Sequence, residues 1–350
     1  MKPSALDYTA LSLSLAAALL AGCDGAQPSI GAPSAMPQSR AALTHPDRSG
    51  SWMLPEAKSE SLLYISDFTP GGSRVYAYTF PDGKLVGALD VEAPGGECVD
   101  KTGDVWITSR SKIVEYAHGG SKPIEALRDS DGPDDCSVDF ASGSLAVSNQ
   151  PSNRNKPGTV LIYSKAQGVP KTYQASSDIR YPNALSYDNR GNLFIDGYWI
   201  GYSGSSCSSG CPYPGFAELS RGANAIRNIK LRGGRYFCGQ SGPGGVEFDG
   251  QYLAIAPACN QYWIYRYFLN RGHGDYKEQL TLNNAAFLFH FWIQDRTLVA
   301  PDCIIVRKNH KAYCEGAIMY YDYPGGGNPT KTITGKNLHY PVAAAVSLAN

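Results

Sequence analysis

Nine cysteines are the residues of this chain whose chemistry can be inferred most directly from their positions. Cys23 stands alone near the N-terminus, while the other eight lie between Cys98 and Cys314. An even set of eight is typical of disulfide bonds formed in an oxidising compartment, because cytosolic thiols stay reduced or bind metal. No Cys-x-x-Cys pair or Cys-His cluster occurs, so a zinc site is not indicated, although some of the eight could be buried free thiols.

The N-terminal segment has the features of an export signal. Residues 11–20 form an apolar run too short to span a bilayer as a stable helix. The run ends in Leu20-Ala21-Gly22-Cys23, which resembles the lipobox where bacterial lipoproteins are lipidated on the cysteine and cleaved before it. The resemblance implies a signal peptide over residues 1–22 and a lipid on Cys23 that anchors the protein to a bacterial membrane, facing the periplasm or the cell surface. An ordinary secretory signal with an incidental cysteine is the alternative.

Residues 23–59 are rich in Ala, Ser, Pro and Gly and show no sustained hydrophobic period. Such a segment cannot bury enough apolar surface to fold alone, so we expect a flexible tether. A coil of about 35 residues has an end-to-end distance on the order of 30 Å. The tether would hold the remaining domain, residues 60–350, clear of the membrane.

Motifs of the common catalytic and nucleotide-binding classes are missing from the chain. The sequence has no Gly-x-Ser-x-Gly elbow, His-Glu-x-x-His pair, Walker loop or dinucleotide fingerprint. His290 lies between Phe289 and Phe291, where a structural histidine is favoured over a ligand. No catalytic residue is identified, and a protein without enzymatic activity is favoured.

Composition narrows the class of fold and of partner. Lys plus Arg and Asp plus Glu both number 31, so no net field attracts the phosphates of a nucleic acid. Gly (38), Pro (23) and Tyr (23) are abundant, which suits short strands joined by tight turns. The composition indicates an all-β protein that does not bind nucleic acid.

One pattern recurs five times after residue 60: an apolar stretch, an Asp, a Gly turn, a short apolar strand, a loop, and a strand that ends in Tyr or a similar residue. The fifth copy lacks the Asp. The second strands of the five copies lie at residues 105–107, 145–147, 193–195, 252–255 and 297–299. A spacing of about 40 to 60 residues is typical of one four-stranded propeller blade.

The two ends of the chain complete a sixth copy. Residues 340–348 have the pattern of a first strand, while residues 62–67, 74–80 and 84–89 have that of the second, third and fourth. Joining them closes the ring and removes exposed sheet edges. The sequence therefore predicts an all-β, six-bladed β-propeller of four-stranded blades whose ring is closed by the N- and C-terminal strands. Seven blades or an open sandwich are the alternatives.

The repeated Asp and Gly between the first two strands and the Tyr of the third are similar to those of NHL-type six-bladed propellers. That family includes binding scaffolds and some lyases, and the gluconolactonase-like group of the same architecture is metal-dependent, so the fold does not settle the function. The gluconolactonase-like resemblance implies a calcium or magnesium ion in the central channel, held by Glu97, Asp135, Asn183 and Asp196. The fourth and fifth copies offer apolar residues at the equivalent positions, so no cofactor is the favoured expectation.

Strand direction alternates within a blade, so the loops after the second and fourth strands emerge at the same end. All eight of the later cysteines fall at that end. Pairing between neighbours in the chain predicts the disulfides Cys98–Cys136, Cys207–Cys211, Cys238–Cys259 and Cys303–Cys314.

The longest loop at this end, residues 197–215, contains Tyr198, Trp199, Tyr202 and Tyr213. Stiff aromatic side chains supply large contact area at low entropic cost, so we expect this loop to border a ligand site. Packing of the loop on its own blade is the alternative.

Two functions remain open. The favoured one is a monomeric, lipid-anchored binding scaffold that recognises a protein or carbohydrate through its disulfide-bearing loop face. The alternative is a metal-dependent lactonase-like hydrolase or lyase with its site at the mouth of the central channel.

Overall fold

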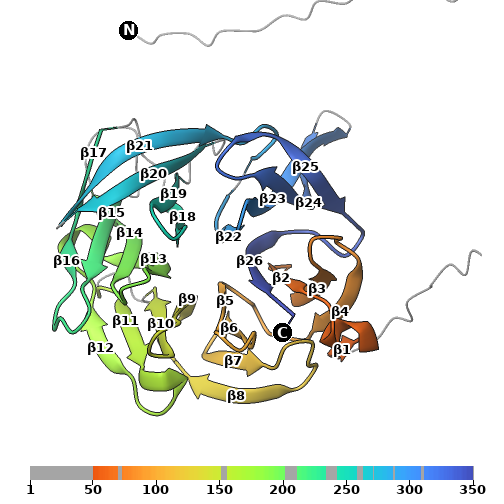
Figure 1. Ribbon diagram of the computed structural model, residues 1–350, viewed down its shortest axis with the longest axis horizontal. Coiled ribbons are helices and arrows are strands. Elements are labelled where there is room, and N and C mark those ends of the chain that lie inside the picture. The colour runs from red at the N-terminus through yellow and green to blue at the C-terminus, as the bar shows by residue number, and fades with distance from the viewer. Residues whose placement is uncertain are drawn as a thin grey trace, which may run out of the picture. The chain divides into compact units, whose positions relative to one another are not determined.

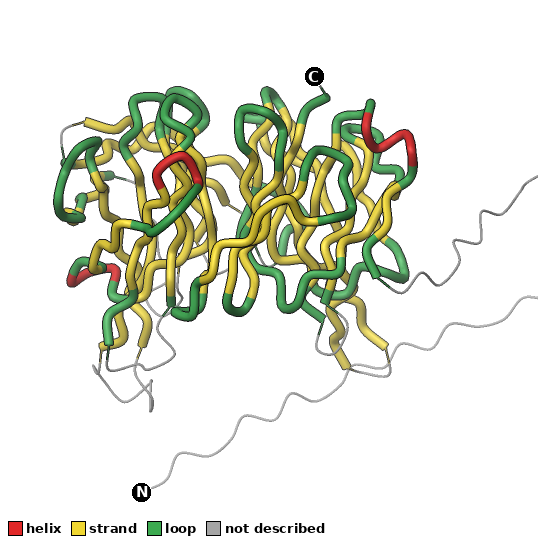
Figure 2. Tube along the Cα trace, turned by 90° about the horizontal axis from the view of Figure 1, so that it is seen from below, coloured by secondary structure: helices red, strands yellow, loops and turns green. Residues whose placement is uncertain are grey.

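Six antiparallel sheets stand around a central axis, one for each copy of the repeated pattern (Figure 1). The computed structural model describes residues 50–69, 73–150, 156–201, 211–233, 243–257, 263–270, 272–286, 288–308 and 311–349. The prediction of an all-β, six-bladed propeller is confirmed. Figure 2 shows the ring from the side, with the C-terminus on one of its two faces.

The first three blades follow the chain from its N-terminal side. Blade 1 consists of the inner strand β26 (Pro341–Ser347), then β2 (Leu62–Asp67), β3 (Arg74–Thr79), β4 (Leu85–Leu89) and β1 (Trp52–Met53). Blade 2 consists of β5 (Glu97–Val99), β6 (Val105–Ser109), β7 (Lys112–Tyr116) and β8 (Pro123–Arg128). Blade 3 consists of β9 (Pro133–Asp139), β10 (Ser144–Asn149), β11 (Thr159–Tyr163) and β12 (Lys171–Gln174).

The other three blades complete the ring. Blade 4 consists of β13 (Tyr181–Tyr187), β14 (Leu193–Gly201), β15 (Cys211–Leu219) and β16 (Arg227–Asn228). Blade 5 consists of β18 (Pro243–Phe248), β19 (Leu253–Pro257), β20 (Trp263–Asn270) and β21 (His273–Thr281), with β17 (Lys230–Arg232) parallel to β21. Blade 6 consists of β22 (Trp292–Gln294), β23 (Thr297–Lys308), β24 (Lys311–Asp322) and β25 (Gly326–Thr334).

The repeated Asp and Gly form the turn between the first and second strands of a blade. In blade 4, Asp188 Oδ1 accepts hydrogen bonds from the backbone N–H groups of Arg190 at 2.9 Å and Asn192 at 2.8 Å. Gly191 in this turn has φ +81°, a conformation that favours glycine. The corresponding side chains of three other blades also accept a hydrogen bond from the turn backbone: Asp100, Asp139 and Asp249. The repeat is therefore a structural requirement of the turn.

Each part of the core fills the space between two neighbouring blades. One cluster contains Trp106 from blade 2 together with Val147 and Tyr163 from blade 3, all of them fully buried. Tyr163 closes the third strand of its blade, the place where the repeat calls for a large aromatic residue. Packing between blades, more than within them, therefore buries the large side chains.

Strand β26 closes the ring as predicted. It pairs antiparallel with β2, with Val346 opposite Leu63. On its other side, Ser347 Oγ donates a hydrogen bond to the carbonyl oxygen of Gly103, in the first turn of blade 2, at 2.5 Å. The C-terminal strand is thus bonded to blades 1 and 2, whose other strands come from the N-terminal part of the folded chain.

The folded body begins earlier than residue 60, the boundary taken from composition. Trp52 pairs with Ala88 of β4, and the 3-10 helix Pro55–Lys58 buries Ala57 completely. Met53 covers Gly87, where a Cβ would overlap the methionine sulfur. A strand of two residues is too short to show a hydrophobic period in the sequence, so β1 becomes apparent only from its pairing with blade 1.

The signal peptide, the lipid site Cys23 and most of the tether lie outside the described residues. Among the residues that the structure describes, no helix has the length and apolar character that a membrane crossing requires.

Ending the chain after Tyr340 should abolish cooperative folding, because it deletes β26 and leaves the inner edge of β2 unpaired. Circular dichroism during heating should then show no sharp unfolding transition. A control chain ending after Ser347 keeps all of β26 and should melt within about 5 °C of the intact protein, given how little a terminal tripeptide contributes. A cooperative transition in the shorter chain would contradict the closure by β26.

Candidate functional site

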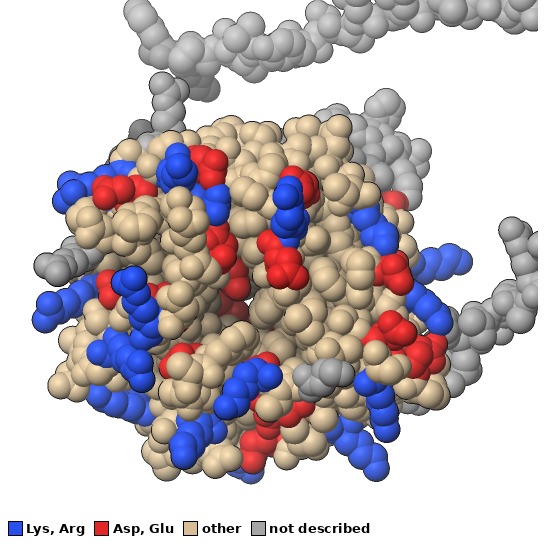
Figure 3. All heavy atoms as spheres, in the orientation of Figure 1, with Lys and Arg blue, Asp and Glu red and all other residues tan. Residues whose placement is uncertain are grey.

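A cavity of about 880 Å³ lies at the axis of the ring and is lined by the inner strands of all six blades. Its lining extends into the turns between first and second strands at Lys101, Phe140 and Asn189, and to Leu348 beyond β26. The cavity therefore opens on the face that carries these turns. Figure 3 looks onto this face and shows acidic side chains gathered around the central hollow.

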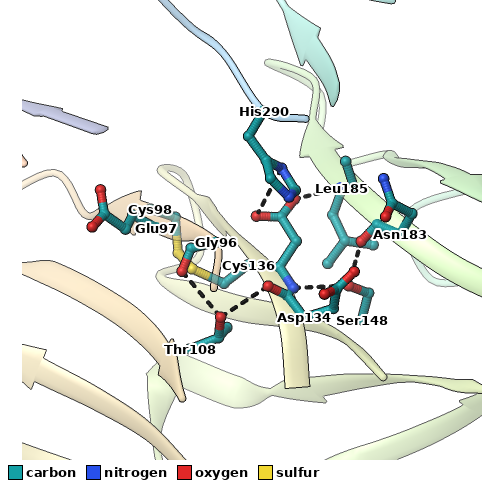
Figure 4. A network of polar contacts seen from close by, with 12 residues as sticks. Gly96, Glu97, Cys98, Thr108, Asp134, Cys136, Ser148, Asn183, Leu185 and His290 are labelled. Carbon is teal, nitrogen blue, oxygen red and sulfur yellow. Dashed lines mark hydrogen bonds and ion pairs between the residues drawn. A yellow bond between two sulfur atoms is a disulfide. The ribbon is translucent and has the colours of Figure 1, made fainter. Parts of the chain in front are cut away.

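The carboxyl groups of Glu97 and Asp135 and the imidazole of His290 line the cavity on its inner strands and beside them. Figure 4 shows Glu97 and His290. His290 Nδ1 is 3.8 Å from Asp135 Oδ1, while Asp135 Oδ2 accepts a hydrogen bond from the N–H of Leu185 at 2.8 Å. Glu97 Oε1 accepts a hydrogen bond from Ser66 Oγ at 2.7 Å. The other oxygen, Glu97 Oε2, is buried and has no hydrogen-bond partner among the described residues.

Polar side chains at the ends of second strands hold the next blade in place. Thr108 Oγ1 of blade 2 is bonded to the carbonyl oxygens of Gly96, at 3.1 Å, and of Asp134 in blade 3, at 2.9 Å. Ser148 Oγ of blade 3 donates to the carbonyl oxygen of Asn183 in blade 4 at 2.5 Å. These contacts position the inner strands, and with them the cavity wall (Figure 4).

The acidic groups near the axis are poorly solvated, which favours their neutral forms. Burial raises the pKa of Asp135 to about 7 and that of Asp134 to about 6. Burial also raises the pKa of Glu97 and of Glu247 well above the usual range, with the charge of Asp135 adding to both. Burial lowers the pKa of His290, so the imidazole supplies little compensating charge at neutral pH.

The four candidate metal ligands are placed in blades 2, 3 and 4, and most are engaged in fixing the backbone. Asp196 Oδ1 accepts the N–H of Ala184 at 2.7 Å, and Asn183 Nδ2 donates to the carbonyl oxygen of Gly244 at 2.8 Å. Asp135 is bonded to Leu185, as described above. Glu97 and Asp135 line the same cavity, whereas Asn183 and Asp196 are not part of its lining.

Among the described Asp, Glu, His and Cys residues, a trio with ligand atoms within 4.8 Å of one another occurs at Asp100, Asp104 and Glu115. It includes none of the candidate ligands from the sequence. An ion held by Glu97, Asp135, Asn183 and Asp196 stays a prediction.

The disulfide between Cys98 and Cys136 is present, with the two Cα atoms 5.6 Å apart, which confirms the first predicted pair. Cys98 occupies the position of the repeat where blades 3 and 4 have Ser137 and Ser186. Those two hydroxyl oxygens accept the N–H groups of Tyr187 and Phe248 in the following blades, at 3.0 Å and 2.9 Å. Blades 2 and 3 are thus joined by a covalent bond at the level where blades 3 and 4, and blades 4 and 5, are joined by a hydrogen bond.

The other three cysteine pairs stay predictions. Cys207, Cys238 and Cys259 lie outside the described residues. Cys211 is the first residue of β15, while Cys303 and Cys314 lie on the adjacent strands β23 and β24, opposite Gly316 and Ile305 respectively. The side chains of these three are not among those described.

The aromatic loop is described only in part. Tyr198 stacks on Tyr181 of its own blade with ring centroids 5.0 Å apart, which agrees with the packing alternative for this residue. Trp199 is 40% exposed. Tyr213 lies opposite Trp199 on β15, but its side chain is not described, and Tyr202 lies outside the described residues. A ligand-binding role for this loop stays a prediction.

Sequence reasoning missed His290 and Glu247 as residues of the cavity. The flanking phenylalanines made His290 resemble a core residue. Glu247 occupies the position of Ser137 and Ser186 in the repeat, so a charged residue there is a departure from the pattern. Comparing the copies position by position could have identified it.

No protein-family model matches the chain, and no curated protein matches it. A comparison with solved structures supports the fold. A protein of unknown function from Bacteroides caccae superposes with a TM-score of 0.57 at 12% identity, covering 83% of this chain and 99% of that one. U3-55K has a TM-score of 0.48 at 11% identity, covering 85% and 80%. Hydrazine synthase from Kuenenia stuttgartiensis has a TM-score of 0.46 at 12% identity, covering 67% and 64%.

Replacing Asp135 with Asn should stabilise the protein, and the gain should grow with pH. An acid whose pKa is higher in the folded state than in the unfolded state binds more protons when the protein is folded. The folded state therefore loses stability as the pH rises through the window from the unfolded pKa to the folded pKa. Here the window runs from about 3.9, the unfolded value, to about 7. The advantage of D135N in urea unfolding should increase by about 2–3 kcal/mol between pH 5 and pH 8.

The exposed Asp90, changed to Asn, is the matched control and should show no such increase. Equal pH dependence in D135N and the unaltered protein would contradict the assignment.

Removing the disulfide with the double change Cys98→Ala and Cys136→Ala should lower the free energy of unfolding by about 4 kcal/mol, since the bond closes a loop of 38 residues. Guanidinium titration of the variant and the oxidised parent measures the difference. Peptide mapping of the non-reduced parent checks the pairing itself. A decrease in the free energy of unfolding below about 1 kcal/mol would mean that packing alone, without the disulfide, stabilises the interface between blades 2 and 3.

Proposed function

We propose that the protein is a lipid-anchored binding β-propeller of an extracytoplasmic compartment that holds a small organic ligand in its central channel. The observation that carries the proposal is the cavity of about 880 Å³. Binding sites for small molecules are typically about 300–1,000 Å³ and largely preformed. A space of this size, left unfilled by side chains from six blades, is large enough for a ligand of several functional groups.

The wall of the cavity is rigid, which favours binding. Cys98 and Cys136 both line the cavity, so their disulfide fixes the spacing of two inner strands. Hydrogen bonds that Ser137 and Ser186 accept from the backbone of the following blade join β9 to β13 and β13 to β18. A preformed wall spares the ligand the entropic cost of ordering it.

The lipid anchor and the location are supported by the sequence alone. The lipobox-like Leu20-Ala21-Gly22-Cys23 would place the lipid on Cys23, and the following segment would separate the propeller from the membrane. Membership of the NHL-type group is proposed on the repeated Asp-Gly turn, whose hydrogen bonds are described above.

A second recognition surface is proposed on the loop of residues 197–215, for a protein or a carbohydrate. The exposed Trp199 supports it, because a large aromatic side chain at a surface is a common anchor of such contacts.

Two variants distinguish the channel from the loop. Changing Ala141 and Asn189 to Trp places bulk at two exposed positions of the cavity mouth, where the fold tolerates it. Replacing residues 202–210 with Asn-Gly, together with Cys211→Ser, shortens the loop while Gly201 and residue 211 stay paired.

A ligand found by thermal-shift screening of a small-molecule library should bind the mouth variant at least about tenfold more weakly in calorimetry. It should bind the loop variant as it binds the parent. The opposite pattern would place recognition on the loop and overturn the channel proposal.

A further inference from the structure

The cavity wall is acidic although the whole chain carries no net charge, with 31 residues of each sign. The acidic side chains among its lining are Glu97, Asp100, Asp135, Asp139, Asp188 and Glu247. Lys101, at the mouth, is the one Lys or Arg among the described lining residues. A cleft with low-dielectric walls and one sign of charge concentrates its field and attracts the opposite charge.

Three of the six carboxyl groups are engaged in turns and three are available to a ligand. Asp100, Asp139 and Asp188 hold the turns between first and second strands, as described above. The remaining three, Glu97, Asp135 and Glu247, lie deeper, on the inner strands β5, β9 and β18. This inner set of three carboxyl groups is the part of the wall that can recognise charge.

The hydrogen bonding of this inner set is not fully satisfied by the described residues, as Glu97 shows. Its side chain is 5% exposed, and Oε2 has no hydrogen-bond partner among the described residues. A buried carboxyl oxygen without a donor costs free energy, because its lost hydrogen bonds to water are not replaced. A donor that enters through the channel would remove this cost.

The inner set does not offer the clustered side-chain ligands of a metal site. Its carboxyl oxygens and His290 form no group of three ligand atoms within 4.8 Å of one another, so an ion there would need most of its ligands from water, amide or backbone oxygens. A molecule several atoms across can reach donors to separate oxygens. The spacing thus favours an organic donor over an inorganic one.

The walls beside the carboxyl groups suit an organic body. Phe248, Phe291 and Trp292 line the same cavity. Aromatic side chains contact apolar carbon and attract a cation over their faces. The indole N–H of Trp292 is also buried without a hydrogen-bond partner among the described residues, so it can donate to an acceptor on a ligand.

We propose that the central channel binds an organic cation, a small amine or guanidinium compound, whose charged end is held by Glu97 and Asp135. The inference rests on the proposed function, because it takes the channel as the binding site. The N–H groups of the cation donate to Glu97 Oε2 and to the Asp135 carboxylate. The carbon body lies against Phe291 and Trp292.

Binding of a cation should also move protons. Glu97, Asp135 and Glu247 in the cavity wall, and Asp134 and Asp196 outside its lining, have raised pKa values, and a nearby positive charge favours their ionised forms. His290 is held neutral by burial and does not oppose the ligand at neutral pH. Affinity should therefore rise between pH 6 and pH 8, with protons released on binding.

The test is isothermal titration of the purified protein with three amines and with the uncharged counterparts of two of them, cadaverine and tyramine. Agmatine, cadaverine and tyramine are the cationic probes, and 1,5-pentanediol and tyrosol are the neutral controls. We expect at least one amine to bind with a dissociation constant below about 1 mM, and the neutral controls to bind about tenfold more weakly or not at all. Repeating the titration in buffers of different ionisation enthalpy measures the released protons.

Glu97→Gln and Asp135→Asn should each weaken binding of the amine about ten- to hundredfold, which corresponds to the loss of a charge-assisted hydrogen bond. The exposed Glu125 and Asp90, changed to Gln and Asn, are the matched controls and should leave the affinity unchanged. Thermal unfolding of all four variants checks that the fold is kept.

Each remaining outcome overturns one of the two proposals. Neutral probes that bind as tightly as the amines, with affinity lost in the Ala141 and Asn189 mouth variant, would refute the cation and leave the channel as the site. The cation is also refuted if no amine binds with a dissociation constant below about 1 mM. Binding of an amine that is lost in the loop variant but kept in the mouth, Glu97 and Asp135 variants would refute the channel itself.

Discussion

The inner strand of each blade has one edge that no strand pairs with, and its buried backbone groups need partners from the neighbouring blade. Side chains supply them: Asp135 accepts the N–H of Leu185, Ser137 that of Tyr187, and Ser186 that of Phe248. These bonds set the distance between inner strands. Between blades 3 and 4 and between blades 4 and 5, they keep the inner strands apart beside the cavity at the axis.

The same requirement places carboxyl groups where water is scarce. Asp135 and Asp196 serve as backbone acceptors near the axis, and burial raises the pKa of each. A serine could accept a single N–H without this cost, as Ser137 does. Acidic residues in such positions lower the stability of the empty protein at neutral pH, and local departures of this kind are typical of functional sites. The proposed ligand would offset the cost by bringing a positive charge.

Much of the fold was predictable because its signals are local. The Asp and Gly of the first turns in blades 2 to 5 satisfy hydrogen bonds within five residues, as at Asp188 and Gly191, so they repeat visibly in the sequence. The Cys98–Cys136 pair was predictable because neighbouring blades bring equivalent strands together. The docking of Trp52 and Met53 on β4 depends on the bare surface of Gly87, a contact between residues over 30 positions apart.

Sequence alone determined the six-bladed ring, its closure by the two ends and the choice of Glu97 and Asp135 as notable polar residues. Only the tertiary structure decided which of the candidate ligands share the cavity wall. Glu97 and Asp135 do, together with Glu247 and His290, which were not candidates. Asn183 and Asp196 instead fix the backbone. The reason is physical. A repeat specifies which residues occupy equivalent positions, but the direction of a side chain and the water around it depend on which blade packs beside it.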